Sequence, residues 1–175
     1  RFQVIVHFIS PNITANKTEI CSGQSVELNA SLNAPVIPNT VFTGIFNLDF
    51  YYLSDFKANF FIAEQFANKY SGHLVSIHST AEKSFLTRNL NVSFLIGLND
   101  ELVENDFVWT DGTPRDFNSW AGGEPNNSGN EDAVIMTSGS GLWYDIPTSY
   151  NDFFVFKLNS GVTYSWSTGE VSESI

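Results

Sequence analysis

The sequence is poor in cysteine and in basic residues. Cys21 is its single cysteine, so no disulfide can form within the chain, and no Cys or Cys/His spacing typical of a zinc site occurs. Only 8 Lys and Arg stand against 19 Asp and Glu, for a net charge of −11. Because affinity for nucleic acid and for anionic membranes comes from Lys and Arg, this balance argues against both classes of partner. No apolar run reaches the length of a membrane span, which argues against insertion.

Aromatic residues are abundant by contrast. The chain has 16 Phe, 6 Tyr and 4 Trp, and 42% of its 175 residues are hydrophobic. This is enough for a core and favours a β-rich or α+β protein of one or two domains. The chain begins with Arg1 and not with Met, so we expect a fragment of a longer protein.

The middle of the chain predicts alternating helices and strands. Three apolar residues at a spacing of four predict a helix over residues 58–70: Ile62, Phe66 and Tyr70. Ser79 and Glu82 have the spacing of a capping box and open a second helix. The apolar stripe of that helix is expected at Phe85, Leu86 and Leu90. Buried strands are expected over residues 50–53, 73–77, 94–98, 107–109, 133–136 and 153–156.

One stretch, from Asn118 to Asp145, gathers oxygen donors in a Gly-rich backbone. The donors are Glu124, Asn126, Asn127, Glu131, Asp132 and Asp145. Carboxylates this dense repel one another unless a cation lies among them, and Ca²⁺ accepts six to eight oxygen ligands in a flexible shell. Mg²⁺ prefers a tighter octahedron with waters, and Zn²⁺ would need His or Cys. The alternative is a solvated acidic loop.

An enzyme is not expected. A glycosidase needs one carboxylic acid in an apolar pocket opposite a second carboxylate, whereas Glu124, Glu131 and Asp145 stand in polar Gly- and Asn-rich sequence. The three His form no recognisable triad, so we expect His73 and His78, which flank a predicted strand, to be structural.

Residues from about 45 to 158 resemble the C-type lectin domain. The landmarks occur in order at residues 50–53, 63–64, 72–77, 96–98, 107–109, 111–112, 120, 124–126, 131–132, 143 and 145. The resemblance implies an α+β fold in which two helices flank small antiparallel sheets and a long irregular loop holds Ca²⁺.

The same resemblance implies two calcium sites. The main site would use Glu124, Asn126, Glu131 and Asp145, which would also bind two vicinal sugar hydroxyls. An accessory site would use Asp100, Glu104, Asn127, Glu131 and Asp132, with an ordinary acidic turn at Asp100 and Glu104 as the alternative. The order Glu-Pro-Asn resembles lectins of the mannose, glucose and fucose type, and Pro125 is expected to be cis.

The chain departs from the family pattern in two respects. Tyr144 stands where many members have an Asn that supplies a Ca²⁺ oxygen and an amide donor to the sugar. The four usual cysteines are replaced by Ala67 and Phe156 at one pair and by Ala133 and Thr148 at the other. Losing a disulfide costs about 2–5 kcal/mol, and a Phe ring packed on Ala would offset part of it. Members without disulfides occur in bacterial surface proteins, which this chain resembles.

The flanks resemble a second family. Residues 18–31 joined to residues 160–175 resemble the first half of the immunoglobulin-like modules of bacterial adhesins. On this interpretation residues 1–10 are the last strand of a preceding module, and residues 11–39 and 159–175 belong to an immunoglobulin-like domain. Residues 40–158 are then a lectin-like domain inserted into it. The alternative is that the flanks are linkers.

These features predict a non-enzymatic, Ca²⁺-dependent carbohydrate-binding module of an extracellular or cell-surface adhesin. Its partners would be glycans and the neighbouring immunoglobulin-like modules of the same polypeptide, with weak binding per site and avidity from repeated modules. The alternative is a module that binds protein, ice or another surface, in which Ca²⁺ only shapes the loop. Tyr144 keeps that alternative open.

Overall fold

The computed structural model describes residues 12–15, 28–31 and 33–160. The chain divides into two compact units, one formed by Arg1–Val36 with Ser160–Ile175 and the other by Ile37–Asn159. In the first unit β1 (Asn12–Ala15) pairs antiparallel with β2 (Leu28–Ser31). The described part of this unit shows one two-stranded ladder and no β-sandwich, so the immunoglobulin-like flank stays a prediction. The strand expected over residues 1–10, Cys21, and residues 161–175 of the expected immunoglobulin-like domain lie outside the described residues.

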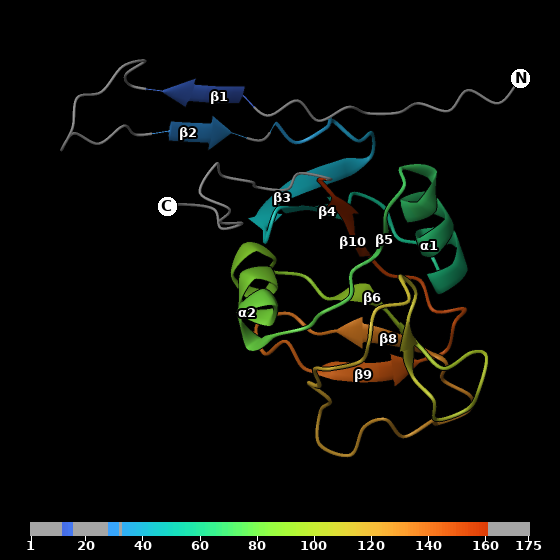
Figure 1. Ribbon diagram of the computed structural model, residues 1–175. Helices are drawn as coiled ribbons and strands as arrows, with labels where there is room; N and C mark the ends of the chain where they lie inside the picture. Colours follow the sequence, from blue (N-terminus) through green and yellow to red (C-terminus); the bar gives the residue numbers. More distant parts are fainter. Residues whose placement is uncertain (1–11, 16–27, 32, 161–175) are drawn as a thin grey trace, which may run out of the picture. The chain divides into compact units, whose positions relative to one another are not determined.

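Two four-stranded antiparallel sheets form the second unit (Figure 1). The order of the first sheet is β3 (Thr40–Phe46), β4 (Asp49–Ser54), β10 (Val155–Asn159) and β5 (His73–Leu74). The second sheet has the order β7 (Val108–Trp109), β6 (Phe94–Asn99), β8 (Ala133–Met136) and β9 (Trp143–Ile146). A strand lies at each of the six predicted places, although β5 and β7 are shorter than expected and β10 begins two residues later than the predicted strand 153–156. β3 and β9 were not predicted, because neither has the alternating apolar pattern of a half-buried strand.

Two ten-residue helices flank the sheets, as the sequence predicts. α1 (Phe60–Lys69) is capped by Asn59, whose side chain accepts the amide of Ile62. The predicted apolar stripe of α1 is wrong at Ile62, whose exposed fraction is 51%. The buried residues of this helix are Phe60, Ala63 and Ala67. They follow an i, i+3, i+7 spacing, and the two small Ala side chains allow the helix to lie close to the sheet.

α2 (Thr80–Asn89) begins where the capping box predicts. The Ser79 hydroxyl accepts the Glu82 amide at 3.1 Å. The Glu82 carboxylate does not complete the box in the usual way, because it accepts the amide of His78 at 2.8 Å and the Tyr51 hydroxyl at 2.7 Å. The cap therefore joins the helix to β4 as well as to its own first turn.

The core lies between the sheets and contains aromatic side chains where the family has a disulfide. Ala67 and Phe156 are both fully buried. The Phe156 ring stacks on Tyr52 at 5.3 Å and meets Phe66 edge-on at 5.8 Å between ring centroids. Burial of these rings stabilises the position that a cross-link would otherwise hold.

Candidate calcium and carbohydrate site

Trp143 anchors the long loop to the second sheet. Its ring is fully buried and meets Trp109, Trp120 and Phe117 edge-on at 5.7, 6.0 and 5.8 Å between centroids. The Trp143 amide donates to the Ser119 carbonyl at 2.8 Å, and its carbonyl accepts the Ala121 amide at 2.9 Å. These contacts hold the loop beside β9. Trp143 directly precedes Tyr144 and Asp145 in that strand.

Three of the four residues predicted for the main calcium site lie together. Asp145 is buried, with 4% of the residue exposed. Its carboxylate accepts hydrogen bonds from the backbone amides of Asn126 at 2.9 Å and Asn127 at 2.7 Å. Asn126 donates from its side-chain amide to the Glu124 carboxylate at 2.5 Å. The Glu124–Pro125 peptide bond is cis, as predicted. Loop and strand thus bring residues about twenty positions apart into one cluster.

The charges of this cluster are unbalanced. A hydrogen bond with the Asp145 carboxyl raises the pKa of Glu124, with partial desolvation and the charge of Glu131 adding to the rise. Carboxylates held close together repel one another when both are charged, which favours the protonated form of one of them. A cation among Glu124, Glu131 and Asp145 would relieve this repulsion.

The residues predicted for the accessory site are linked by direct contacts. Asn127 donates from its side chain to the Glu104 carboxylate at 2.9 Å and accepts the Glu131 amide at 2.7 Å. The Asp100 amide donates to the Asp132 carbonyl at 3.2 Å. The contacts form two sets, one of Glu104, Asn127 and Glu131 and one of Asp100 and Asp132, and both join the loop after β6 to the long loop.

Asp100 carries the orphaned atom of this group. The residue is 2% exposed, and Oδ2 accepts the Asn105 amide at 2.8 Å, whereas the buried Oδ1 has no hydrogen-bond partner within the described part of the chain. Desolvation raises the pKa of Asp100, and Glu104 and Asp132 add to the rise. An unpartnered buried carboxylate oxygen is costly, and a hard cation is the partner that it fits.

The donor types fit Ca²⁺, although the side chains are not gathered into a finished shell. Within residues 33–160 no group of three or more Asp, Glu, His or Cys side chains has the arrangement of a metal centre. The carboxylates of Asp145 and Glu131 instead accept backbone amides of the loop. Asn126 and Asn127 contribute amide oxygens to the potential ligand set, which is the mixed carboxylate and amide chemistry that Ca²⁺ accepts.

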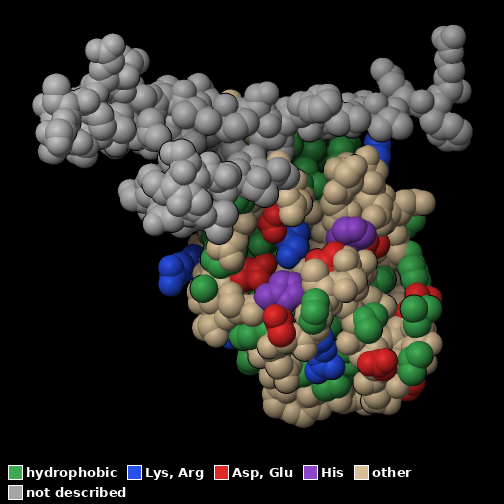
Figure 2. All heavy atoms as spheres, viewed as in Figure 1, with side chains coloured by type: hydrophobic (Ala, Val, Ile, Leu, Met, Phe, Trp, Pro, Cys, Tyr) green, Lys and Arg blue, Asp and Glu red, His purple; other side chains and the backbone are tan. Residues whose placement is uncertain are grey.

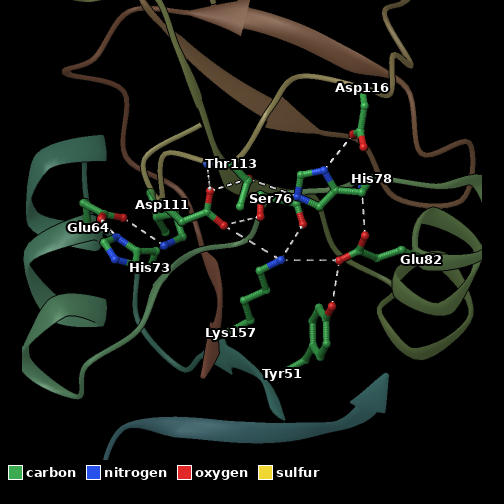
Figure 3. Close-up of polar contacts among 11 residues, drawn as sticks. Tyr51, Glu64, His73, Ser76, His78, Glu82, Asp111, Thr113, Asp116 and Lys157 are labelled. Atoms are coloured by element: carbon green, nitrogen blue, oxygen red, sulfur yellow. Dashed lines mark hydrogen bonds and ion pairs between the residues drawn. The ribbon is translucent and has the colours of Figure 1, made fainter. Parts of the chain in front are cut away.

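A polar network that the sequence did not reveal holds the start of the long loop (Figure 3). Asp111 accepts the Ser76 hydroxyl and the amide of Thr113 at 3.0 Å. His78 contacts Asp116 at 2.7 Å through Nδ1 and Thr113 at 3.1 Å through Nε2. His73 pairs with Glu64 at 2.6 Å, so both His take structural contacts, as expected. The turn chemistry of Asp111, Gly112 and Thr113 is a local signal for the Asp111–Thr113 contact, whereas no local pattern links His78 to Asp116.

The sequence model described as "Lectin C-type domain" matches residues 56–155. The chain belongs to the C-type lectin domain family. The family consists of binding modules and not of enzymes. Echinoidin of Heliocidaris crassispina is 41% identical over 98 residues, which cover 50% of this chain and 67% of that lectin. The low affinity immunoglobulin epsilon Fc receptor of Mus musculus is 45% identical over 86 residues, which cover 48% of this chain and 26% of the receptor. The C-type lectin domain thus matches only about a quarter of that receptor.

Solved structures show the same fold. The cow CD23 C-type carbohydrate-recognition domain, determined in the presence of a GlcNAc2Man3 oligosaccharide, has a TM-score of 0.64 and 30% identity, covering 73% of this chain and 98% of that domain. A calcium-independent type II antifreeze protein has a TM-score of 0.63 and 25% identity, covering 73% and 97%. The fold therefore serves both a carbohydrate-recognition domain and an antifreeze protein.

These relatives do not support the expected bacterial context. Echinoidin and the epsilon Fc receptors come from Heliocidaris crassispina, Mus musculus and Homo sapiens, and they give no support to a bacterial adhesin with immunoglobulin-like modules. No helix in the described part of the chain has the length and apolar character needed to cross a bilayer.

Proposed function

We propose that this domain binds carbohydrate in a Ca²⁺-dependent manner and that its ligand is a sugar of the mannose, glucose or fucose type. The observation that carries the proposal is the cluster of Glu124, Asn126 and Asp145, in which Asn126 donates hydrogen bonds to both carboxylates and their proximity raises the pKa of Glu124. Family membership adds support, because C-type lectin domains typically bind Ca²⁺ and include carbohydrate-recognition domains.

In this proposal, one set of residues holds the calcium ions and part of the same set contacts the sugar. Glu124, Asn126, Glu131 and Asp145 hold the main ion, and Asp100, Glu104, Asn127, Glu131 and Asp132 hold the accessory one. The chemistry that bound Ca²⁺ supplies is a pair of coordination positions for two vicinal hydroxyls. Glu124 accepts a hydrogen bond from a hydroxyl, and the Asn126 amide donates one to a hydroxyl oxygen. No covalent bond changes, so the outcome is reversible binding.

Calorimetric titration with mannose, fucose and galactose, with Ca²⁺ and with chelator, tests this function. We expect mannose or fucose to bind only with Ca²⁺, galactose to bind more weakly, and Glu124→Gln or Asp145→Asn to abolish binding. Asp106→Asn is the matched control, because Asp106 is an exposed carboxylate of the neighbouring loop that has no predicted role as a ligand. Equal mannose binding in chelator would overturn the proposal.

The exposure of Tyr144 supports a second candidate function, binding to ice or another extended surface. Tyr144 is 37% exposed at the site, and the fold is shared by a calcium-independent antifreeze protein. We infer that, if sugar binding fails, the surface around Tyr144 binds ice or another extended surface. Thermal hysteresis measured with and without chelator separates the two functions, because a soluble monosaccharide lectin produces none.

The relatives also suggest a cellular location and partners for the domain. We place the domain outside the cell, because the relatives are secreted or surface lectins. Its partners would be glycans at cell surfaces or in the matrix. Neighbouring immunoglobulin-like modules of the same polypeptide remain a proposal drawn from the flanking sequence alone.

A further inference from the structure

A small polar hollow of about 230 Å³ lies on the first sheet and shares no residue with the proposed calcium sites. Its walls come from the start of β4, the turn after α1, the segment after β7 and the middle of β10. They include Asp49, Gly72, His73, Asp111, Thr113 and Lys157. Figure 2 shows this face, where Lys and acidic side chains lie between two His side chains. Binding pockets for drug-sized ligands measure roughly 300–1,000 Å³, so this hollow suits something smaller.

Lys157 brings an incompletely bonded ammonium group to the hollow. Only 15% of its side chain is exposed. Nζ donates to the Ser76 carbonyl at 3.3 Å, whereas Glu82 and Asp111 are 3.8 and 3.9 Å away, beyond hydrogen-bond distance (Figure 3). An ammonium group has three donors, so Lys157 has capacity for a further acceptor.

Asp49 brings a carboxylate without a hydrogen bond. None of the hydrogen bonds among the described residues involves its side chain, although the residue is only partly exposed. Burial raises the pKa of Asp49, Lys157 opposes the rise, and Glu82 and Asp111 add to it. Partial burial of a carboxylate that has no hydrogen bond is unfavourable in the free protein. Such groups often occur at binding sites, where a ligand supplies the missing partner.

Hydrogen bonds and close backbone packing hold the walls between these two groups. Asp111 has its oxygens filled by Ser76 and Thr113. The His73 ring is held by Glu64, whose second oxygen accepts the Leu74 amide at 2.8 Å. A Cβ on Gly72 would lie 2.5 Å from the Lys157 carbonyl oxygen, so only Gly lets β10 pass this close. A ligand would therefore meet preformed groups and would lose little energy to rearrangement.

We propose that this hollow binds a small zwitterion of amino-acid size, with its ammonium group at Asp49 and its carboxylate at Lys157. The two groups have opposite charge and each lacks a full set of partners. A lone anion would meet Asp49, Asp111 and Glu82 as well as Lys157, and a lone cation would meet the Lys157 ammonium. A zwitterion satisfies both groups and adds no net charge to a chain whose net charge is −11.

Titration of glycine into the ¹⁵N-labelled full chain, in chelator so that the calcium sites play no part, tests the proposal. We expect saturable amide shifts at residues 71–73, 111–113 and 157–159, with methylammonium and acetate binding at least about ten-fold more weakly, a difference of 1.4 kcal/mol. Asp49→Asn should weaken glycine binding by at least the same factor. Asp55→Asn, at an exposed carboxylate just beyond β4, should leave it unchanged.

Three results would overturn the proposal. They are the absence of saturable shifts with glycine at tens of millimolar, methylammonium binding as tight as that of glycine, and unchanged affinity in Asp49→Asn. The test does not depend on Lys157 variants, which would leave Glu82 and Asp111 without their cation and disturb the fold. Because glycine is titrated without Ca²⁺, failure here leaves the proposed lectin function untouched.

Discussion

At the scale of single residues, Tyr144 is the position of the proposed calcium and carbohydrate site that departs from the expected family pattern. It lies in β9 opposite Ile135, between the buried Trp143 and the buried Asp145, with 37% of the residue exposed. We expect Tyr144→Asn to strengthen Ca²⁺-dependent mannose binding about three- to ten-fold, because an amide adds a carbonyl ligand and one hydrogen-bond donor worth about 0.5–1.5 kcal/mol. Calorimetric titration at saturating Ca²⁺ measures the change.

Tyr144→Phe is the matched control for that change. It removes the hydroxyl without adding an amide, so mannose affinity should stay unchanged. If Tyr144→Asn and Tyr144→Phe bind mannose with equal affinity, any gain over the parent chain does not come from the amide. Indifference of binding to Tyr144→Asn would favour the surface-binding function instead.

The half-buried carboxyl of Asp49 should impose a pH dependence on stability. Its pKa is higher in the folded chain than in the unfolded chain, because burial disfavours the charged form. A raised carboxyl pKa favours the folded state at low pH, and this contribution is lost as pH rises through the folded pKa. Asp49→Asn should therefore increase the free energy of unfolding at pH 7 by up to about 0.5 kcal/mol and raise the melting temperature slightly. Near pH 3 the variant should have no such effect.

Melting curves of the parent chain and Asp49→Asn, recorded from pH 3 to 8 without added ligand, measure this difference. The difference should grow with pH and level off above the folded pKa. A variant that is less stable at neutral pH would mean that Asp49 has a stabilising partner.

At the scale of elements, the start of α2 shows how a local signal acquires a tertiary role. Ser79→Ala removes the acceptor of the Glu82 amide and should cost about 1 kcal/mol. Glu82→Ala should cost more, about 3–5 kcal/mol, because it also leaves the Tyr51 hydroxyl and the His78 amide without their acceptor and removes one of the two carboxylates beside Lys157. Denaturant unfolding of both variants gives the two values.

Ser84→Ala is the control for this pair, since Ser84 lies inside α2 and has no role in the cap. It should change stability by less than about 0.5 kcal/mol. If Glu82→Ala costs no more than Ser79→Ala, the carboxylate contributes to the helix cap alone and the contacts to β4 and β10 are unimportant.

At the scale of the whole molecule, Ca²⁺ should act as a stabilising ligand of a strongly acidic domain. A ligand that binds only the folded state, at 100 times its dissociation constant, adds about 2.7 kcal/mol to the free energy of unfolding. We expect millimolar Ca²⁺ to raise the melting temperature and chelator to reverse the effect. Mg²⁺ should do less, because it demands a tighter octahedral shell.

Two single variants, Asp145→Asn and Asp100→Asn, test the two sites in this measurement. Each should reduce the Ca²⁺-induced rise in melting temperature, because Asp145 is a predicted ligand of the main site and Asp100 of the accessory site. A melting temperature that does not respond to Ca²⁺ in the parent chain would contradict both proposed sites.

Sequence alone determined the parts of this protein that depend on neighbouring residues. The capping pair Ser79 and Glu82, the apolar strands 94–98 and 133–136, and the cis bond before Pro125 were all predicted and are present. The capping pair and the strands are encoded within a few residues, through hydrogen bonding to the local backbone and side-chain periodicity, whereas the cis bond was expected from the resemblance to the C-type lectin family. The order of the family landmarks then sufficed to predict the α+β fold.

Tertiary structure alone decided which distant groups meet. It buried Ala63 in place of Ile62, left Asp100 Oδ1 without a partner, and brought Asp49 and Lys157 into one hollow. The last two residues lie on adjacent strands of the first sheet, although more than a hundred positions separate them. No local pattern encodes such a meeting, because the order of the strands is set by the packing of the whole core and not by the residues that the packing brings together.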